Sequence, residues 1–478
     1  MMQEYKISEI QTKIRDREFT CEQYLNVLLA NYDQRNENLN CVLQIDRQGA
    51  LEYAKQIDSK VRSGQSLGPL FGVFIGVKDN IHVTGFRSTC ASKMLENFEP
   101  GFDATCVERL KAAGAFILSK LNCDEFAMGS SNENSAFGIV RNPIAEDCVP
   151  GGSSGGSAAA VSANMVTVAL GSDTGGSIRQ PASFCGVVGL KPGYGSVSRY
   201  GLVAFASSLD QIGPLGRSAE DCELIFHIIC GRDPKDATSG NYESKSTEGP
   251  IKVGIVEEFF DSDYDPKFKN FYQQRLDELA KISNLEFKKV SIPSLRHCLP
   301  VYYILSSAEA SSNLARYDSV RYGPVLADSN DLLETYQLNR EKGFGKEVKR
   351  RILLGTYVLS EGYFDSYYKK ALKIRSILKT QFEKVMSETD ILIGPTTPST
   401  AFPLGERNED PLEMYKSDLF TVPANIIGCP AISLPAGDLD SKPLGIQLMS
   451  LNGNEDSLIS FTKIVQAHLD RSRSNGDL

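Results

Sequence analysis

The chain has 478 residues, of which 41% are hydrophobic and 23% are charged, and its formal net charge is −9. This length and hydrophobic content suffice for a large buried core, either in one large α/β domain or in two or three smaller ones. The negative charge speaks against a protein that holds nucleic acid through its overall field.

Local features narrow the class further. A basic run at 346–351 stays open as a local basic face, although such runs are usually solvated helix faces. The N-terminus has no apolar signal core, and no run is long and apolar enough to span a bilayer. The 11 cysteines are scattered, without a Cys-x-x-Cys pair or zinc spacing. We therefore expect reduced thiols in the cytoplasm, or in an organelle stroma or matrix in a eukaryote.

The first half of the chain predicts alternating helices and strands. Apolar residues recur at helical spacing over 7–32, and a second helix is predicted over 48–62. A buried strand is predicted over 73–77, then a helix over 103–112 capped by Asp103, and a strand over 116–119. Small residues over 157–163 suit a tightly packed helix, and a buried strand follows over 166–170. This alternation is typical of an α/β layer fold.

The second half opens with a polar stretch at 233–250, which is predicted to be a linker or surface loop. A strand is predicted over 251–256 and an amphipathic helix over 266–282. Long helical periodicity covers 347–385, and further strands are predicted over 390–394, 431–434 and 444–449.

Two glycine–serine loops, at 151–157 and 171–177, and an upstream lysine, Lys78, are the residues that suggest chemistry. A serine nucleophile needs a base. The four histidines do not suit that role: His227 reads as a core or helix-face residue, and His82 as a turn residue, while His297 and His468 read as surface and helix positions. Lysine is the remaining base, and burial at the end of the apolar segment 74–77 would lower its pKa toward neutrality.

The glycine loops have other possible uses. Residues 151–155 match Gly-x-Ser-x-Gly, but such matches are frequent in a Gly/Ser-rich run, and no strand is predicted before them. No phosphate-binding Gly-x-x-x-x-Gly-Lys-Ser/Thr occurs. A flexible linker is a third interpretation of 151–157, and the apolar residues that follow speak against it. The 174–177 segment can instead present backbone N–H groups to a tetrahedral oxyanion.

Together these residues resemble the amidase signature family. The resemblance rests on Lys78, the loop at 151–157, the stretch 171–186 and the segments 189–193 and 207–214. It implies that Ser177 is the nucleophile, that Lys78 is the base and that Ser153, in a cis peptide, relays the proton. The oxyanion hole would be formed by Thr174, Gly175, Gly176 and Ser177.

The fold that the resemblance implies is a single α/β domain over 1–478, with a twisted mixed sheet and helices on both faces. Its catalytic core would cover about 65–220. Within the family, the stretches 122–131, 301–305, 308–317 and 345–357 are similar to the glutaminase subunits of tRNA-dependent amidotransferases. That similarity implies that glutamine is the substrate and that ammonia passes to a partner subunit.

The same similarity implies partners rather than cofactors. The chain has no nucleotide motif, so ATP, magnesium and most tRNA contact are expected in the partner, with no cofactor or metal in this chain. The expected partners are the B and C subunits of such an enzyme. No association with a membrane is expected.

Glutamine carries an α-carboxylate and an α-ammonium group, so a selective pocket needs a cation and an anion. By resemblance these are Arg351 and Asp418, with Arg350 as the alternative cation. The pocket would also be lined by Met128, Gly129, Ser130 and Tyr302. A stand-alone amidase for a small amide or peptide amide and a catalytically silent assembly scaffold are the rival functions.

Overall fold

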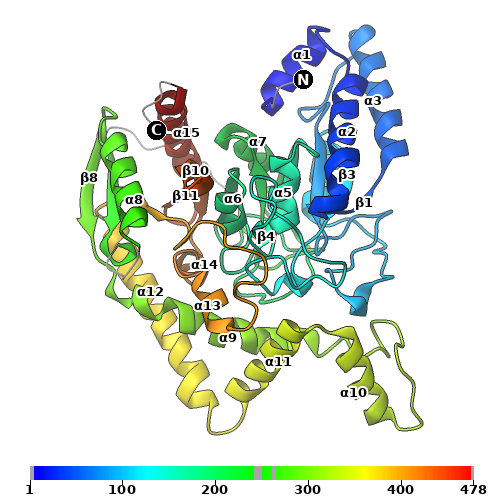
Figure 1. The fold of residues 1–478 in the computed structure, drawn as a ribbon, viewed down its shortest axis with the longest axis vertical. Helices are drawn as coiled ribbons and strands as arrows, with labels where there is room; N and C mark the ends of the chain where they lie inside the picture. Colours follow the sequence, from blue (N-terminus) through cyan, green and yellow to red (C-terminus); the bar gives the residue numbers. More distant parts are fainter. Residues whose placement is uncertain (1–4, 242–249, 261–264, 475–478) are drawn as a thin grey trace.

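The computed structural model describes residues 5–241, 250–260 and 265–474 (Figure 1). The described strands form one mixed sheet in the order β1-β3-β2-β4-β6-β5-β10-β11-β9-β7-β8. Their bounds are β1 Val42–Ile45, β2 Phe74–Lys78, β3 Phe116–Leu121, β4 Val168–Asp173, β5 Val188–Lys191, β6 Gln211–Gly216, β7 Ile251–Val256, β8 Leu285–Val290, β9 Ile391–Pro395, β10 Ala431–Leu439 and β11 Lys442–Met449.

The helices lie between these strands in the chain. They are α1 Ile7–Arg15, α2 Cys21–Leu39, α3 Arg47–Arg62, α4 Thr105–Ala112, α5 Gly155–Ser162, α6 Arg179–Phe184, α7 Ala219–Ile229, α8 Pro266–Leu279, α9 Cys298–Leu314, α10 Leu332–Gly343, α11 Lys346–Leu359, α12 Lys369–Met386, α13 Pro411–Lys416, α14 Val422–Ile427 and α15 Glu455–Ser474. Short 3₁₀ turns are η1 Lys93–Leu95, η2 Glu125–Ala127, η3 Glu257–Phe259 and η4 Pro293–His297, and η5 Phe364–Tyr368 is a π-helical turn.

Both faces of the sheet are buried, because alternate residues of its strands enter two different cores. On β2, Phe74 packs into a core shared with α2, α3 and α5, whereas Ile75 and Val77 pack into the core shared with α4 and α7. On β4, Ala169 belongs to the first core and Leu170 to the second. This period of two places helices on both faces of the sheet, as predicted.

Three predicted helices differ from those in the structure. The segment 7–32 forms two helices, because Thr20 caps α2 with its side chain and starts a new helix after a turn. Asp103 does not cap α4, which begins after Ala104; its carboxylate accepts from the Thr84 N–H at 2.7 Å instead. The periodicity over 347–385 is divided between α11 and α12 by the η5 turn.

The polar stretch 233–250 lies only partly within the described residues, since 242–249 fall outside them. Residues 233–241 contain turns. The Asp233 carboxylate fixes this segment to the rest of the fold by accepting hydrogen bonds from the hydroxyls of Thr105 and Ser198, each at 2.6 Å.

Candidate active site

The sheet places the predicted base beside the second glycine–serine loop. Lys78 is the last residue of β2, which runs parallel to β4 with Val77 opposite Leu170. The carboxyl ends of parallel neighbours meet at the same edge of a sheet. Ser172 and Asp173 end β4 at that edge, and the loop 174–177 follows them.

Lys78 is completely buried, and its amine is surrounded by hydroxyl groups. Its Nζ lies 2.7 Å from Ser153 Oγ and 2.9 Å from both Ser154 Oγ and Ser172 Oγ. Burial lowers the pKa of Lys78 to about 8, although acidic groups around it, including Asp124, act in the opposite direction. An amine with this pKa exists partly in the neutral form near pH 7.5, so it can accept a proton there.

Ser177 meets the Lys78 cluster at the start of α5. The Ser154 N–H donates to the Ser177 carbonyl at 3.1 Å, which brings Ser177 against the residue that follows Ser153. The Gly152–Ser153 peptide is cis, as the resemblance implied. Ser177 keeps 7% of its surface exposed, whereas Ser153 is fully buried. Solvent or a substrate therefore has access to Ser177 rather than to the groups behind it.

Asp173 shapes the loop that carries Ser177. Its carboxylate accepts from the Gly176 N–H at 2.8 Å and from the Ile178 N–H at 3.2 Å, on either side of Ser177. The Gly176 N–H, one of the four predicted oxyanion donors, is therefore engaged with Asp173 in this structure. The Thr174 hydroxyl donates to Asp210 at 2.7 Å, which fixes the start of the loop.

A buried guanidinium balances the charge of Asp173. Arg179 donates from Nε and Nη2 to the two carboxylate oxygens, both at 3.0 Å, and both side chains are fully buried. Asn425 of α14 donates to the same carboxylate at 2.9 Å. Burial opposes ionisation of Asp173, but the charge and hydrogen bonds of Arg179 outweigh it and lower the pKa of Asp173 to about 2. The loop is thus held by a carboxylate that stays ionised.

The predicted anion of the glutamine pocket, Asp418, lies close to the predicted lining residue Ser130. Asp418 Oδ2 accepts from Ser130 Oγ at 2.8 Å and from Tyr303 Oη at 3.1 Å. Asp418 is 6% exposed, and burial raises its pKa to about 7. A cationic ligand group beside it would favour the ionised form.

The predicted cation, Arg351, is buried on α11. Its guanidinium lies over the ring of Tyr303 at 4.4 Å and over that of Tyr415 at 4.8 Å, and its Nε donates to Glu347 at 2.6 Å. Arg351 Nη1 is buried without a hydrogen bond, and so is available to a ligand. The alternative, Arg350, is 45% exposed and pairs with Glu347 from the solvent side.

The remaining predicted lining residues divide into two groups. Gly129 and Ser130 line a cavity of about 40 Å³ together with Arg351, while Met128 is fully buried beside them. Tyr302 lies instead against the nucleophile loop, where a Cβ on Gly175 would come within 2.5 Å of its Cζ. Its neighbour on α9, Tyr303, contacts Asp418, so consecutive residues of α9 contact the nucleophile loop and the predicted pocket.

Comparisons with known proteins show the family of the chain. The amidase family model matches residues 23–459. The chain belongs to the amidase family. It is 48% identical over 462 residues to the A subunit of glutamyl-tRNA(Gln) amidotransferase from Geobacillus kaustophilus, and the match covers 95% of each chain. It is 47% identical over 482 residues to the same protein from Bacillus velezensis, and that match covers 99% of each chain.

Solved structures show the same fold. The crystal structure of the A subunit of glutamyl-tRNA(Gln) amidotransferase from Thermotoga maritima is 39% identical, with a TM-score of 0.76 over 93% of each chain. A bacterial aryl acylamidase of the amidase signature family shares the fold alone, with a TM-score of 0.83 at 19% identity. The amidase signature fold predicted from the motifs is therefore confirmed.

Several contacts of this amidase were not predicted. Ser154 and Ser172 touch the Lys78 amine, and Arg179 pairs with Asp173. All four lie in or directly beside the two glycine–serine segments, so their positions were a usable signal. Tyr303 was harder to predict, because only the folded chain brings α9 against Asp418.

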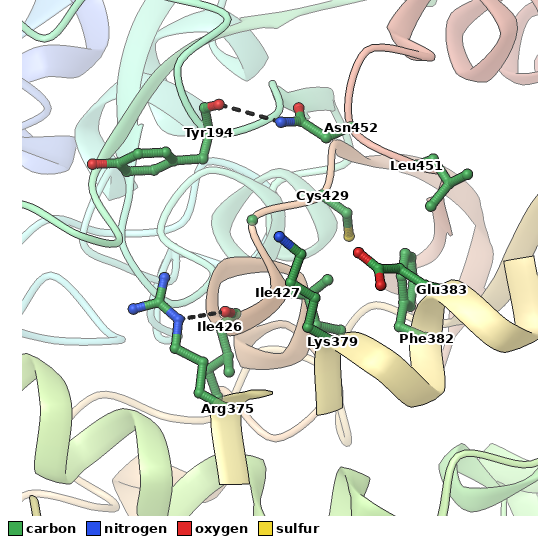
Figure 2. Close-up of a pocket in the computed structure, with 11 residues that line it drawn as sticks. Tyr194, Arg375, Lys379, Phe382, Glu383, Ile426, Ile427, Cys429, Leu451 and Asn452 are labelled. Atoms are coloured by element: carbon green, nitrogen blue, oxygen red, sulfur yellow. Dashed lines mark hydrogen bonds between the residues drawn. The ribbon is translucent and has the colours of Figure 1, made fainter. Parts of the chain in front are cut away.

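Other cavities and side-chain groups of the amidase lie away from this cluster. A cavity of about 390 Å³ lies between α12 and the end of α14, with Arg375 and Lys379 on one wall (Figure 2); none of the predicted site residues lines it. Among the hydrogen bonds of the described residues, none joins a histidine to Lys78, Ser153 or Ser177.

In residues 5–241, 250–260 and 265–474, no three His, Cys, Asp or Glu side chains are grouped to hold a metal. No helix within these ranges has the length and hydrophobicity to cross a membrane.

Proposed function

We propose that this amidase is the glutaminase subunit of a tRNA-dependent amidotransferase. Ser177 attacks the side-chain amide carbon of glutamine, and its proton passes through the Ser153 hydroxyl to the neutral amine of Lys78. The single observation that supports this assignment best is the 2.7 Å contact between Lys78 Nζ and Ser153 Oγ in a fully buried, histidine-free cluster. The names of the relatives supply the class of substrate.

The proposed reaction then runs in two halves. The protonated Lys78 returns its proton to the departing amide nitrogen, so that ammonia leaves and a γ-glutamyl ester remains on Ser177. Water attacks this ester with Lys78 again as the base, and glutamate is released. The developing oxyanion is stabilised by backbone N–H groups of the 174–177 loop, an effect worth about 3–4 kcal/mol for a well-placed donor.

Arg351 and Asp418 would bind the α-carboxylate and α-ammonium groups of glutamine. Ammonia would pass to a partner, the B subunit, that uses ATP and magnesium to convert Glu-tRNA(Gln) to Gln-tRNA(Gln) and makes most of the tRNA contact. A small C subunit would complete a cytoplasmic heterotrimer. No observation favours the stand-alone amidase or the silent scaffold over this proposal.

The experiment is a comparison of two nitrogen sources in the reconstituted complex. The Ser177→Ala variant should lose glutamine-dependent transamidation and keep the reaction with free ammonia, because only the ammonia supply uses Ser177. A matched variant, Ser183→Ala, removes a buried hydroxyl that contacts Thr397 and accepts from the Gly445 N–H, and it should keep both reactions. Loss of both reactions in Ser177→Ala, or survival of both, would contradict the assignment. Rapid glutamine-independent turnover of small amides by the isolated chain would favour the stand-alone amidase.

A further inference from the structure

The helix α12 lies at the outer surface of the molecule (Figure 1), and two cavities lie along one side of it. Between α12 and the start of α9 lies a cavity of about 470 Å³, with Val301, Ile304 and Ile374 among the apolar residues of its lining. A second cavity, of about 410 Å³, follows between α12 and residues 288–293. The two cavities use α12 residues three or four positions apart, so they lie on one helix face. We call this surface the α12 groove.

The edge of the α12 groove is basic, although the whole chain carries a charge of −9. Lys370 lines the first cavity and Lys384 the second, and Lys373 is exposed between them. None of the three forms an ion pair within the described part of the chain. Other lysines nearby are already neutralised: Lys369 pairs with Asp365 at 2.6 Å, and Lys288 with Glu388 at 2.9 Å.

Apolar side chains stand exposed beside these unpaired lysines. Ile377 is 49% exposed, Tyr367 is 42% exposed and Leu372 is 38% exposed. An apolar groove flanked by unpaired cations is complementary to a chain segment that presents apolar side chains between carboxylates. A nucleic acid fits less well, because its phosphates would meet the lysines while the concave apolar floor stayed uncovered.

We propose that the α12 groove binds an acidic amphipathic segment of a partner protein in the complex. This inference rests on the proposed function, which supplies the partners. The apolar side chains of the segment enter the cavity floored by Ile304 and Ile374, and its carboxylates pair with Lys370, Lys373 and Lys384. The cavity of about 470 Å³ has room for more than one large side chain.

The position of the groove gives such a contact a structural consequence. On another side of α12, Arg375 Nε donates to the Ile426 carbonyl of α14 at 2.9 Å (Figure 2). Asn425 of α14 in turn donates to Asp173, which shapes the nucleophile loop. A partner seated in the α12 groove therefore contacts the helix that supports α14.

Photocrosslinking in the assembled complex tests the proposal. p-Benzoylphenylalanine replaces Ile377 in the full chain, which is co-expressed with both partners. The assembled complex is irradiated, and the crosslinked residues are mapped by mass spectrometry. A crosslink to a partner segment in which Asp and Glu outnumber Lys and Arg is expected. A crosslink to RNA, to a neutral or basic segment, or to a second copy of this chain would overturn the proposal, as would an assembled complex without a crosslink. Ile144, which is 48% exposed on a different surface, is the matched control position and should not crosslink to that segment.

A charge-reversal pair supplies the second measurement. Lys370→Glu with Lys384→Glu should raise the dissociation constant of the complex about tenfold at low salt, and high salt should reduce the difference. The matched pair Lys55→Glu with Lys60→Glu, on exposed positions of α3, should leave assembly unchanged. Equal affinities for the two pairs would overturn the proposal. The proposed function is tested separately, by comparing glutamine with free ammonia as the nitrogen source for Ser177→Ala. A failure of the groove proposal can therefore be distinguished from a failure of the proposed function.

Discussion

The pH dependence of glutamine hydrolysis tests the proposed role of Lys78 quantitatively. Only the neutral amine can accept the Ser177 proton, so kcat should follow the deprotonation of Lys78. With a pKa of about 8, the neutral fraction is about 3% at pH 6.5, about 24% at pH 7.5 and about 76% at pH 8.5. We therefore expect kcat to rise about 25-fold between pH 6.5 and pH 8.5 and to level off above pH 9.

The measurement is the initial rate of glutamate formation by the assembled complex at saturating glutamine. At saturating glutamine, the protonation state of Asp418 should not affect kcat. Asp418 acts on glutamine binding, so its titration should change KM instead. Transamidation with free ammonia, followed over the same pH range, corrects for any pH dependence of the partner. Lys78→Arg supplies a matched variant, since a guanidinium stays protonated and should be inactive at every pH.

Two results would refute this reasoning. A kcat that stays flat between pH 6.5 and pH 8.5 would mean that no group with the titration of Lys78 limits the reaction. A kcat that falls as pH rises would mean that the protonated amine is the active form. Either outcome would require a different base for Ser177.

Three further changes have expected outcomes. Asp418→Asn keeps an oxygen for its hydrogen bonds but removes the charge, so KM for glutamine should rise tenfold or more with little change in kcat, as steady-state kinetics would show. Gly175→Ala places a methyl group against Tyr302 and should lower kcat at least tenfold, whereas Gly101→Ala, with nothing within 4 Å of its Cβ, should be neutral in the same assay. Arg179→Met leaves a buried carboxylate without its counter-ion and should cost about 3–5 kcal/mol, measured as a lower urea midpoint. These expectations would be contradicted by an unchanged KM in Asp418→Asn, an unchanged kcat in Gly175→Ala, or an unchanged urea midpoint in Arg179→Met.

The sequence predicted most accurately two strands that are rich in Ile and Val. Ile251–Val256 was predicted with the bounds that the structure shows, and the strand at 73–77 was displaced by one residue. Both are parallel strands rich in Ile and Val, although Lys252 and Gly254 interrupt the first and Gly76 the second. The strands β5 and β6 were missed: β5 has only four residues, and β6 contains Pro214, which weakens its strand signal.

The helix boundaries failed for a different reason. The predicted helix over 7–32 ran through the turn at 16–20, where the apolar spacing after Ile14 lapses and the capping by Thr20 marks the start of α2. At η5, by contrast, aromatic residues keep the pattern apolar, so periodicity alone does not separate α11 from α12. Periodicity reports which face is buried, not where the backbone turns.

The candidate site was predictable as a set of residues but not as an arrangement. Lys78, Ser153 and Ser177 stand in segments whose glycines and serines attract attention, and the fold brings these segments together at one edge of the sheet. The pairing of Tyr303 with Asp418 spans 115 residues and depends on how α9 packs. No local pattern encodes such a contact, because it follows from the tertiary structure.

The charges around Lys78 explain how a buried amine can lose its proton beside acidic residues. Asp173 stays ionised, but Arg179 neutralises it within a 3.0 Å ion pair. Burial raises the pKa of Asp124 to about 7 and that of Asp210 to about 6, so these carboxyl groups carry less charge near neutrality than exposed ones would. The attraction that would keep Lys78 protonated is thereby weakened, and the desolvation of its amine prevails. A serine nucleophile can therefore work here without histidine, provided that the sheet edge keeps water away from the amine.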